Sequence, residues 1–381
     1  MGAVGAGLIS PLASRNRLSS VRYTRRMAKR TAVSGLRRGV TLADVARSAG
    51  VDQSTVSRVL RDDPGTKATP ETRERIRLAA TKLGYVPNAT ARSLAVRSTS
   101  TIGLLIPNVA GFIYADIIRG ASDAARELGY VLVVADASEL GHAGEAIRRL
   151  VLEGRVDGLL LASGVVTDEA AQSLVGESNN VVVLNRQIGG RGPRIIEDDE
   201  RGMMLGTQEL IAHGHERIAF LAGPPDVDTS RRRIKGYRRA MREAGLPLIA
   251  SLMVHAGFDE ADGYRGMQIL LERQPRPTAV AVASLASAIG AMAAVRDAGL
   301  QIPADLSLVA FHDAPLANYL SPPLTTIAMP LKELGRQAVL MLHGRILGKP
   351  GPMLAKVQDP APTLVRRQSV AMPSASEQAL V

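Results

Sequence analysis

A short segment near the start of the chain, TLADVARSAGVDQSTVSRVLR at residues 41–61, concentrates polar side chains on one face of a predicted helix. The helix begins after Asp52, and none of the five outward residues is acidic: Gln53, Ser54, Thr55, Ser57 and Arg58. Amide, hydroxyl and guanidinium groups hydrogen-bond base edges and phosphates in the major groove of DNA. The pattern therefore predicts a helix that enters the major groove.

Neighbouring residues predict the helices that must hold this one in place. Thr41 and Asp44 have the spacing of a capping box, and Gly50 falls where the first helix must stop. A third helix is predicted between Thr69, a good N-cap, and Gly84. Each of the three segments has an apolar stripe at helical spacing, so the sequence predicts a compact helix-turn-helix head.

The net charge of +11 is distributed unevenly along the 381 residues. Residues 1–40 hold nine Lys and Arg and no acid, residues 41–95 hold nine basic and six acidic side chains, and the remainder is close to neutral. This asymmetry is typical of a polyanion-binding head on an ordinary body. We expect residues 1–39 to form a disordered basic extension with nonspecific attraction to phosphates.

Composition excludes other classes of protein. The chain has no cysteine, which excludes disulfides and thiolate metal sites. No apolar run approaches the roughly 20 residues that span a bilayer, so we expect no membrane partner. There is no phosphate loop of the Walker type, no nucleophile elbow and no clustered metal spacing, so we predict no enzyme, no metal and no cofactor. His213 and His215 are expected to mark a helix end and the following loop.

The pattern changes at Thr101 to β-rich apolar runs separated by amphipathic segments. The runs are TIGLLI, YVLVVA, VDGLLLA, NVVVLN, RIAFLA, AVAVA and LSLVAF. Such alternation predicts an α/β fold with parallel sheets covered by helices on both faces. About ten strands exceed one small sheet, so we expect two lobes, with a ligand cleft beyond the carboxyl ends of the strands.

Taken together, these segments resemble the LacI/GalR (lactose-repressor) family of bacterial transcription regulators. Five motifs occur in family order within residues 40–373: TLADVARSAGV…STVSRVL, TRERI…LGYVPNATARSLA, GHERIAFLAGP, RIKGYRRAM and SPPLTTIAMPLKELGRQAV. The resemblance implies a helix-turn-helix head plus hinge helix over residues 40–98. It also implies a two-lobed, periplasmic-binding-protein-like domain for effector binding and dimerisation over residues 99–373, and a tail at 374–381.

The function implied by the resemblance is that of a cytoplasmic homodimer bound to a pseudo-palindromic double-stranded operator. Repression is the default in this family, and a small-molecule effector between the lobes controls operator affinity. A periplasmic solute-binding protein shares the two-lobed fold and remains the alternative, in which the cleft is the primary function. The head, and the lack of a secretory signal at the start of the chain, argue against that alternative.

Roles in DNA binding follow by position. Gln53 and Ser54 are expected to reach base edges, and Arg58 to contact guanine through two hydrogen bonds. Thr55 and Ser57 are expected to hold phosphates, and simple solvation of the helix is the alternative for these two residues and for Arg58. The resemblance implies DNA contacts from Thr41, Gln53, Ser54, Thr55, Ser57, Arg58, Asn88, Ala91 and Leu94.

The segment from Asn88 to Ala95 resembles the hinge helix of the family. In relatives it folds on DNA and wedges an apolar side chain into the minor groove, and Leu94 occupies that position here. The alternative is that Leu94 packs only against its dimer mate. A helix this short is unstable alone, so it can act as a switch that is ordered on the operator.

The same reasoning places effector-binding residues in the cleft, namely Phe112, Tyr114, Asn185, Arg233, Ser284 and His312. Aromatic rings stack on ring-shaped ligands, although lobe core is the alternative for Phe112 and Tyr114. Arg233 matches an arginine that clamps hydroxyls or carboxylates in relatives, with a surface ion pair as the alternative. For Arg231 and Arg232 a surface position is expected.

Two departures from the family pattern bear on the effector. Relatives usually carry Asn-Asp where this chain has Ser284 and Leu285, and relatives often have an acid near His312. A sugar site pairs carboxylates and amides with hydroxyls, so the departures weaken a sugar assignment and admit a less polar or anionic effector. Asp313 either replaces the lost acid or caps the next turn. The effector is therefore expected to be a sugar or a small anion.

Overall fold

A computed structural model describes residues 40–63, 65–86, 98–108, 111–136, 153–162, 168–178, 180–187, 189 and 192–374. The chain divides between Asn88 and Ala89 into two compact units, a small head and a large body. The extension expected over residues 1–39 and the hinge helix expected from Asn88 to Ala95 lie outside the described residues.

The described part of the head contains three helices, α1 (Leu42–Ala49), α2 (Gln53–Leu60) and α3 (Pro70–Leu83). Thr41 and Asp44 form the expected capping box on α1, and Gly50 ends this helix in the left-handed conformation at φ 64°. The Thr69 hydroxyl caps α3. These local signals satisfy the backbone groups at the helix ends, and the prediction of three short helices is confirmed.

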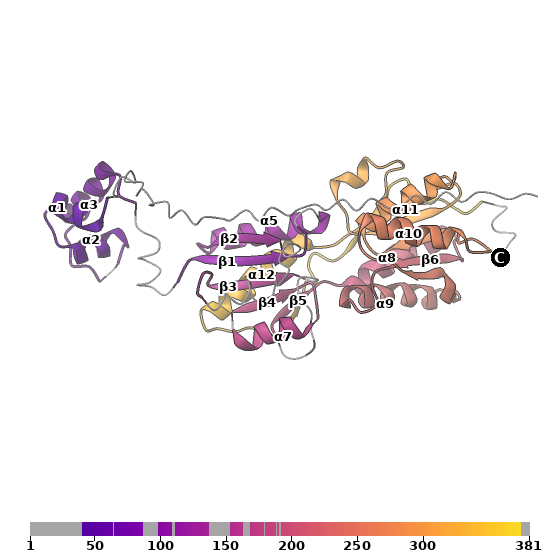
Figure 1. The fold of residues 1–381 in the computed structure, drawn as a ribbon, viewed down its shortest axis with the longest axis horizontal. Helices are drawn as coiled ribbons and strands as arrows, with labels where there is room; N and C mark the ends of the chain where they lie inside the picture. Colours follow the sequence, from indigo (N-terminus) through magenta and orange to yellow (C-terminus); the bar gives the residue numbers. More distant parts are fainter. Residues whose placement is uncertain are drawn as a thin grey trace, which may run out of the picture. The chain divides into compact units, whose positions relative to one another are not determined.

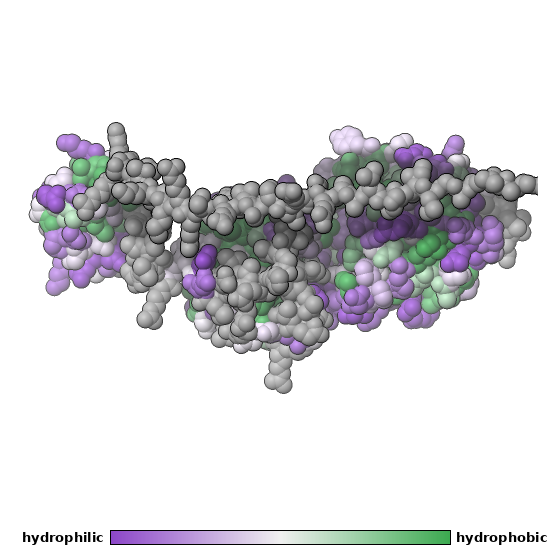
Figure 2. Space-filling model, viewed as in Figure 1, coloured by the Kyte–Doolittle hydropathy of each residue, from purple (hydrophilic) through white to green (hydrophobic). Residues whose placement is uncertain are grey.

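Apolar side chains from all three helices form the core of the head. Val56 and Val59 of α2 are buried in it beside Ile76 of α3 and Val45 of α1. Because these valines turn inward, the opposite face of α2 is left to solvent. Most of the coloured surface of the head in Figure 2 is accordingly hydrophilic.

The body consists of two lobes, each built on a six-stranded sheet (Figure 1). The first sheet is parallel throughout and has the order β11-β5-β4-β3-β1-β2. Its strands are β1 (Thr101–Ile106), β2 (Val131–Asp136), β3 (Gly158–Ala162), β4 (Val181–Leu184), β5 (Arg194–Ile196) and β11 (Leu354–Lys356). The helices of this lobe in the described chain are α5 (Phe112–Glu127), α7 (Asp168–Glu177) and α12 (Leu331–Ile346).

The second sheet has the order β12-β10-β9-β8-β6-β7, and only β12 runs antiparallel to its neighbour. Its strands are β6 (Ile218–Ala222), β7 (Met253–His255), β8 (Ala279–Val282), β9 (Ser307–Phe311), β10 (Thr325–Ala328) and β12 (Thr363–Val365). Its helices are α8 (Asp199–Ala212), α9 (Asp228–Glu243), α10 (Glu260–Leu271) and α11 (Leu285–Asp297), with short 3₁₀ turns η1 (Ala250–Leu252) and η2 (Pro315–Asn318).

Alternate residues of the second sheet face different helix pairs. Val309 and Phe311 of β9 lie on the side of α8, whereas Leu308 and Ala310 join the core beneath α10 and α11. This period of two follows from the strand pleat, and it explains why the strands read as continuous apolar runs. All seven β-rich runs noted in the sequence contain strands of the two sheets.

Glycines set the close packing of α10 against α11. A Cβ atom added to Gly263 would collide with the carbonyl oxygen of Ser287, and one added to Gly290 would collide with that of Glu260. The two helix axes can therefore approach closely, and both helices begin at the carboxyl end of the second sheet. This arrangement places Asp259 and Ser284, the residues before each helix, at the same edge.

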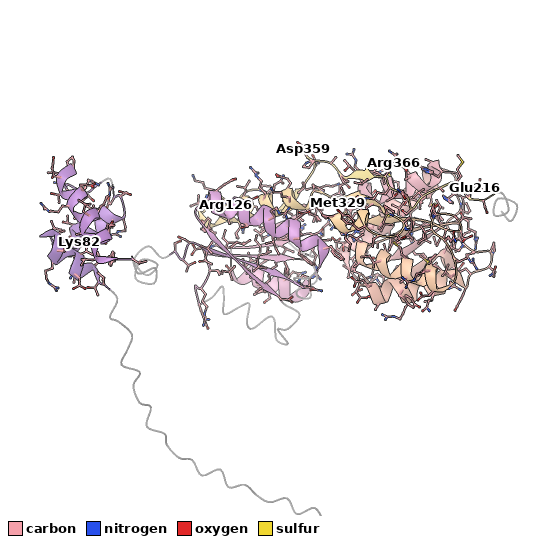
Figure 3. The ribbon with its side chains drawn as sticks, turned by 90° about the horizontal axis from the view of Figure 1, so that it is seen from above. Lys82, Arg126, Glu216, Met329, Asp359 and Arg366 are labelled. Atoms are coloured by element: carbon pink, nitrogen blue, oxygen red, sulfur yellow. The ribbon has the colours of Figure 1, made fainter. Side chains whose placement is uncertain are left out.

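The chain passes between the lobes three times, from β5 to α8, from β10 to α12 and from β11 to β12. Figure 3 labels Met329 at the second of these passages, with Arg126 and Glu216 well away from it in the first and second lobes. Three short connections between two packed lobes are the arrangement from which hinge closure around a ligand is built.

The first residues of the body are anchored to its core sheet. The Asp157 carboxylate accepts hydrogen bonds from the Ser98 hydroxyl at 2.6 Å and from the backbone N–H groups of Thr99 and Ser100 at 2.5 and 2.9 Å. The linker expected between Ser98 and Thr101 is thus held firmly where it enters β1. Within the described residues, no helix is long and apolar enough to cross a membrane.

Candidate nucleic-acid interface and ligand cavity

The outward face of α2 carries the five polar residues that the sequence singled out. Gln53, Ser54 and Arg58 are exposed, and Thr55 and Ser57 are partly exposed. Within the described chain, no hydrogen bond or ion pair engages the side chains of Gln53, Ser57 or Arg58. These three groups can therefore meet a nucleic acid without breaking an internal contact.

Asp52 does more than cap the backbone of α2. Its carboxylate accepts from the Ser54 hydroxyl at 2.6 Å, the Thr55 hydroxyl at 2.7 Å and the Thr55 N–H at 2.8 Å. These hydrogen bonds, with that from Ser54 the strongest, lower the pKa of Asp52 well below its usual range. Ser54 and Thr55 must therefore exchange this partner, or use their free lone pairs, to contact DNA.

Thr41 is similarly engaged within the head. Its hydroxyl donates to the Asp44 carboxylate at 2.7 Å, and its N–H donates to the same oxygen at 3.0 Å. The third predicted group of DNA contacts, Asn88, Ala91 and Leu94, lies outside the described residues.

A cavity of about 520 Å³ lies between the two lobes of the body. It opens where strands of both sheets end. Ala162 and Leu184 are the last residues of β3 and β4 in the first sheet, and Ser284 and His312 follow β8 and β9 in the second. The carboxyl edge is where open α/β sheets bind ligands. All six predicted effector residues line this cavity: Phe112, Tyr114, Asn185, Arg233, Ser284 and His312.

Two residues in the cavity wall have an uncommon backbone conformation. Asn185 at φ 54° follows β4, and His312 at φ 72° follows β9. Left-handed backbone at a residue other than glycine is rare, and where it persists it clusters at functional sites. Both side chains are buried, and one comes from each lobe.

A buried charge network lies behind the cavity wall. Asp199, at the start of α8, accepts from both Arg232 and Arg233 of α9, the latter at 2.8 Å from Nε. Arg232 also pairs with Asp228 at 2.9 Å and donates to the Asn185 carbonyl oxygen Oδ1 at 3.5 Å. Since α8 follows the first passage between the lobes, this network links that passage to the cavity.

The surface position expected for Arg232 is wrong, because the residue is 9% exposed and its side chain is engaged in the network. The buried face of α9 is wide enough to include two consecutive arginines. Asp228, four residues before Arg232, was the available signal for this pair. Arg231 is exposed as expected and donates to the Asp226 carbonyl oxygen at 2.7 Å.

Arg233 is buried in the cavity wall, so the surface ion pair considered for it is excluded. Its guanidinium carbon lies 4.1 Å from the ring centre of Phe311 and 5.6 Å from that of Phe258. Aromatic faces stabilise a cation in this position and hold its plane fixed. Phe258 also lines the cavity and was missed, because it lies in a loop without periodic signal.

The aromatic pair Phe112 and Tyr114 begins α5 in the first lobe. Phe112 packs against the core of the second lobe, so it bridges the cleft. Tyr114 is buried, and that burial raises the pKa of its phenol. Both roles weighed for Tyr114, lobe core and cavity wall, therefore apply to it at once.

The departures from the family pattern place a hydroxyl and an apolar side chain at Ser284 and Leu285 in the second-lobe wall. Ser284 caps α11, accepting from the Ser287 N–H at 3.1 Å and donating to the Phe258 carbonyl oxygen at 2.8 Å. Leu285 and Ala286 follow it in the wall. Asp313 does not line the cavity and instead accepts from Thr326 at 2.6 Å and pairs with Arg367 at 2.9 Å. Neither role considered for Asp313 describes that contact.

Glu197, in the first passage between the lobes, was not noted in the sequence. It is completely buried, and neither carboxyl oxygen has a partner among the described residues. Burial, with the nearby Asp199 carboxylate second, raises the pKa of Glu197 to about 8. At neutral pH this side chain is therefore mostly uncharged.

The two histidines of the HGHER segment have structural positions. His213 is the C-terminal cap of α8, as expected. His215 follows in the loop and uses both ring nitrogens, toward the Thr278 hydroxyl at 2.9 Å and the Ala371 carbonyl oxygen at 2.8 Å. Among the residues that the structure describes, no group of three or more acids and histidines has a geometry suited to a metal ion.

Comparison with known proteins agrees with this architecture. Residues 41–88 match the family described as bacterial regulatory proteins, lacI family, and residues 207–370 match the periplasmic binding protein-like domain. Catabolite control protein A of Priestia megaterium is 34% identical over 306 residues, covering 80% of this chain and 91% of the relative. The chain belongs to the LacI family.

Other members of the family extend the comparison. The ribose operon repressor of Haemophilus influenzae is 35% identical over 331 residues, covering 87% of this chain and 98% of that protein. The crystal structure of the lac repressor dimer bound to operator and the anti-inducer ONPF has a TM-score of 0.76 at 30% identity, covering 88% of this chain and all of that one. This LacI-family chain is thus a DNA-binding transcription regulator with an effector-binding body.

Proposed function

We propose that this regulator binds a pseudo-palindromic operator as a cytoplasmic homodimer, represses transcription there and catalyses no reaction. The observation that carries the proposal is the face of α2, where Gln53, Ser57 and Arg58 are hydrogen-bonding groups without a partner among the residues that the structure describes. Arg58 contacts guanine. Gln53 and Ser54 read the neighbouring base edges. Thr55 and Ser57 hold phosphates and fix the register of the helix.

The hinge completes the contact with the operator. Asn88, Ala91 and Leu94 lie against the minor groove, where Leu94 unstacks and kinks the central base step. To place Leu94 on the operator, the hinge must be attached to a fixed point of the body. The Asp157 carboxylate provides that point by accepting hydrogen bonds from Ser98, Thr99 and Ser100. A change in the first lobe at Asp157 can therefore reach Ser98, where the described part of the body begins.

A small molecule in the cavity controls this contact. Its wall combines Phe112, Tyr114 and Asn185 from the first lobe with Arg233, Ser284 and His312 from the second. A ligand held by both lobes favours one separation of the lobes, and the difference in its affinity for the two separations is the free energy available for control. The lac repressor structure that carries both operator and anti-inducer supports this type of control by analogy.

Selection from a random duplex library tests the proposal. The full chain is used to enrich bound duplexes, which are then sequenced, in parallel with the Arg58→Gln variant and the Arg47→Gln control on α1. We expect a palindromic motif with a central pyrimidine–purine step for the full chain. The control should return the same motif, whereas Arg58→Gln should lose its preference at one base pair in each half-site.

Salt-sensitive binding without an enriched motif would contradict sequence-specific regulation. In that case the cavity, as in a solute-binding protein, would be the primary function. Unchanged base preference in Arg58→Gln would retain the regulator but remove Arg58 from base reading.

A further inference from the structure

Arg233 retains hydrogen-bonding capacity at the cavity. An arginine side chain has five N–H donors, all of which carry a hydrogen permanently. In this residue Nε donates to Asp199 at 2.8 Å, Nη1 to the Ala283 carbonyl oxygen at 2.7 Å and Nη2 to His312 Nε2 at 3.3 Å. Two N–H groups therefore have no acceptor among the described residues.

His312 is a second donor in the same wall. Because Arg233 can only donate, His312 Nε2 must accept, and the proton of the neutral ring is on Nδ1. Burial and the charge of Arg233 lower the pKa of His312 well below its usual range, so the ring is neutral at pH 7. Nδ1 is buried and has no partner among the described residues. A buried donor in this state lacks the acceptor that nearly all such groups have in folded proteins.

Asn185 adds a third donor from the opposite lobe. Its Oδ1 accepts from Arg232 at 3.5 Å, which fixes the amide so that the NH₂ group is the one left without a described partner. Ser284, by contrast, has already given its hydroxyl hydrogen to the Phe258 carbonyl oxygen. Arg233, His312 and Asn185 thus offer donors, whereas sugar hydroxyls also require acceptors.

Carboxylates line the cavity only at one place in the described chain. Asp259 and Glu260, at the start of α10, are both exposed. The inner position that is acidic in relatives is Leu285, which is buried. Negative charge at the exposed start of α10 repels dianions such as phosphates and dicarboxylates more strongly than an anion of single charge.

The buried network is balanced in charge, but Arg233 shares its acid with Arg232. Arg232 and Arg233 are balanced by Asp199 and Asp228, and the raised pKa of Glu197, about 8, leaves that fifth group mostly neutral at pH 7. Asp199 is shared between the two arginines. Arg233 therefore has no carboxylate to itself, and a ligand carboxylate would be a second partner for its fork of donors.

The rest of the cavity fits the apolar part of a ligand. Its wall includes Phe112, Phe258, Leu184, Leu285 and Ile117, and the volume of about 520 Å³ is in the range for ligands of one or two rings. Burial of apolar ligand surface supplies the affinity, while the donors fix the orientation of the charged end.

We propose that the effector is a small monocarboxylic acid with an apolar carbon skeleton, whose carboxylate lies against Arg233, His312 and Asn185. The proposal rests on the function proposed above, in which this cavity is the effector site. It deepens that function by naming the chemical class of the ligand and by excluding neutral sugars.

Calorimetric titration of the full chain tests the ligand class. The carboxylate probes are benzoate, phenylacetate and hexanoate, their uncharged partners are the corresponding primary amides, and ribose and glucose represent sugars. We expect at least one acid to bind at least tenfold more tightly than its amide, and neither sugar to bind at comparable concentration.

A matched pair of variants tests the position of the carboxylate. Leu285→Asp restores an acid in the wall, and Leu285→Asn has the same shape without charge. We expect Leu285→Asp to bind the acid at least tenfold more weakly than Leu285→Asn, while both retain the thermal transition of a folded body.

The outcomes separate the two proposals. Equal binding of acid and amide, binding of a sugar instead, or binding of none of the acids would overturn the ligand class, and equal affinity of the two variants would overturn its placement. The same acids are then added to the chain on its selected duplex. An acid that binds the cavity without changing DNA affinity would retain the ligand class and contradict effector control.

Discussion

Replacement of Glu197 by Gln is expected to change the pH dependence of stability. Glu197 is completely buried between the lobes, and its pKa is raised from the usual 4.5 to about 8. Between these pH values the folded chain holds a proton that the unfolded chain releases. The stability of the native protein therefore falls as pH rises through this window, because folding must retain that proton.

The size of the effect follows from the two pKa values. One pKa unit corresponds to about 1.4 kcal/mol, and integration between pH 5.5 and 8.0 gives a loss of about 3 kcal/mol for this one group. Gln has nearly the shape of the protonated acid and cannot ionise. The free energy of unfolding of Glu197→Gln minus that of the native chain should therefore grow by about 3 kcal/mol across this interval.

Urea denaturation followed by far-ultraviolet circular dichroism measures this difference, since the chain has no tryptophan to report by fluorescence. The native chain, Glu197→Gln and the exposed control Glu216→Gln are compared at pH 5.5, 6.5, 7.2 and 8.0. Other titrating groups cancel in the difference between variants. A constant offset between the native chain and Glu197→Gln would refute a neutral buried carboxyl, and an equal slope in Glu216→Gln would assign the effect to general charge.

Four further variants test the head, the hinge and the body. Arg58→Gln should weaken binding to the selected duplex by about 1–3 kcal/mol in fluorescence anisotropy, with Arg47→Gln close to native; equal losses would point to charge alone. Leu94→Ala should weaken specific binding and spare the salt-dependent binding of random DNA, so parallel losses would count against the wedge. Asp157→Ala should leave ligand affinity in calorimetry unchanged and reduce the response of DNA affinity to ligand; a full response would remove Asp157 from the coupling. Gly290→Ala should lower the free energy of unfolding by about 1–3 kcal/mol or more, because the added methyl group meets the backbone of α10, and native stability would contradict that packing.

Much of the fold was predictable because its signals are local. The capping box at Thr41, the left-handed Gly50 and the Thr69 cap each act within one helical turn, so the sequence displays them directly. The β-rich runs are equally legible, since strands buried on both faces are apolar throughout. The three passages between the lobes could not be predicted from such local signals, because they depend on which sheet each strand joins.

The cavity was predictable in part. The six expected residues follow strand ends or match family positions, and they do surround one space. The surface position predicted for Arg232 was wrong, because which side of a helix is buried depends on the elements that pack against it. The roles of Glu197 and Phe258 arise from packing between segments far apart in the chain, and no spacing rule reveals such neighbours.

The most direct test of the account compares two duplexes at one salt concentration. The affinity of the full chain is measured for the selected palindrome and for a scrambled duplex of the same length and composition, at 150 mM salt. Sequence-specific binding by α2 predicts a preference of at least about 10³-fold for the palindrome, as specific protein–DNA complexes show over nonspecific ones. A ratio near one would contradict it, since the polar face of α2 would then contribute only nonspecific attraction to phosphates.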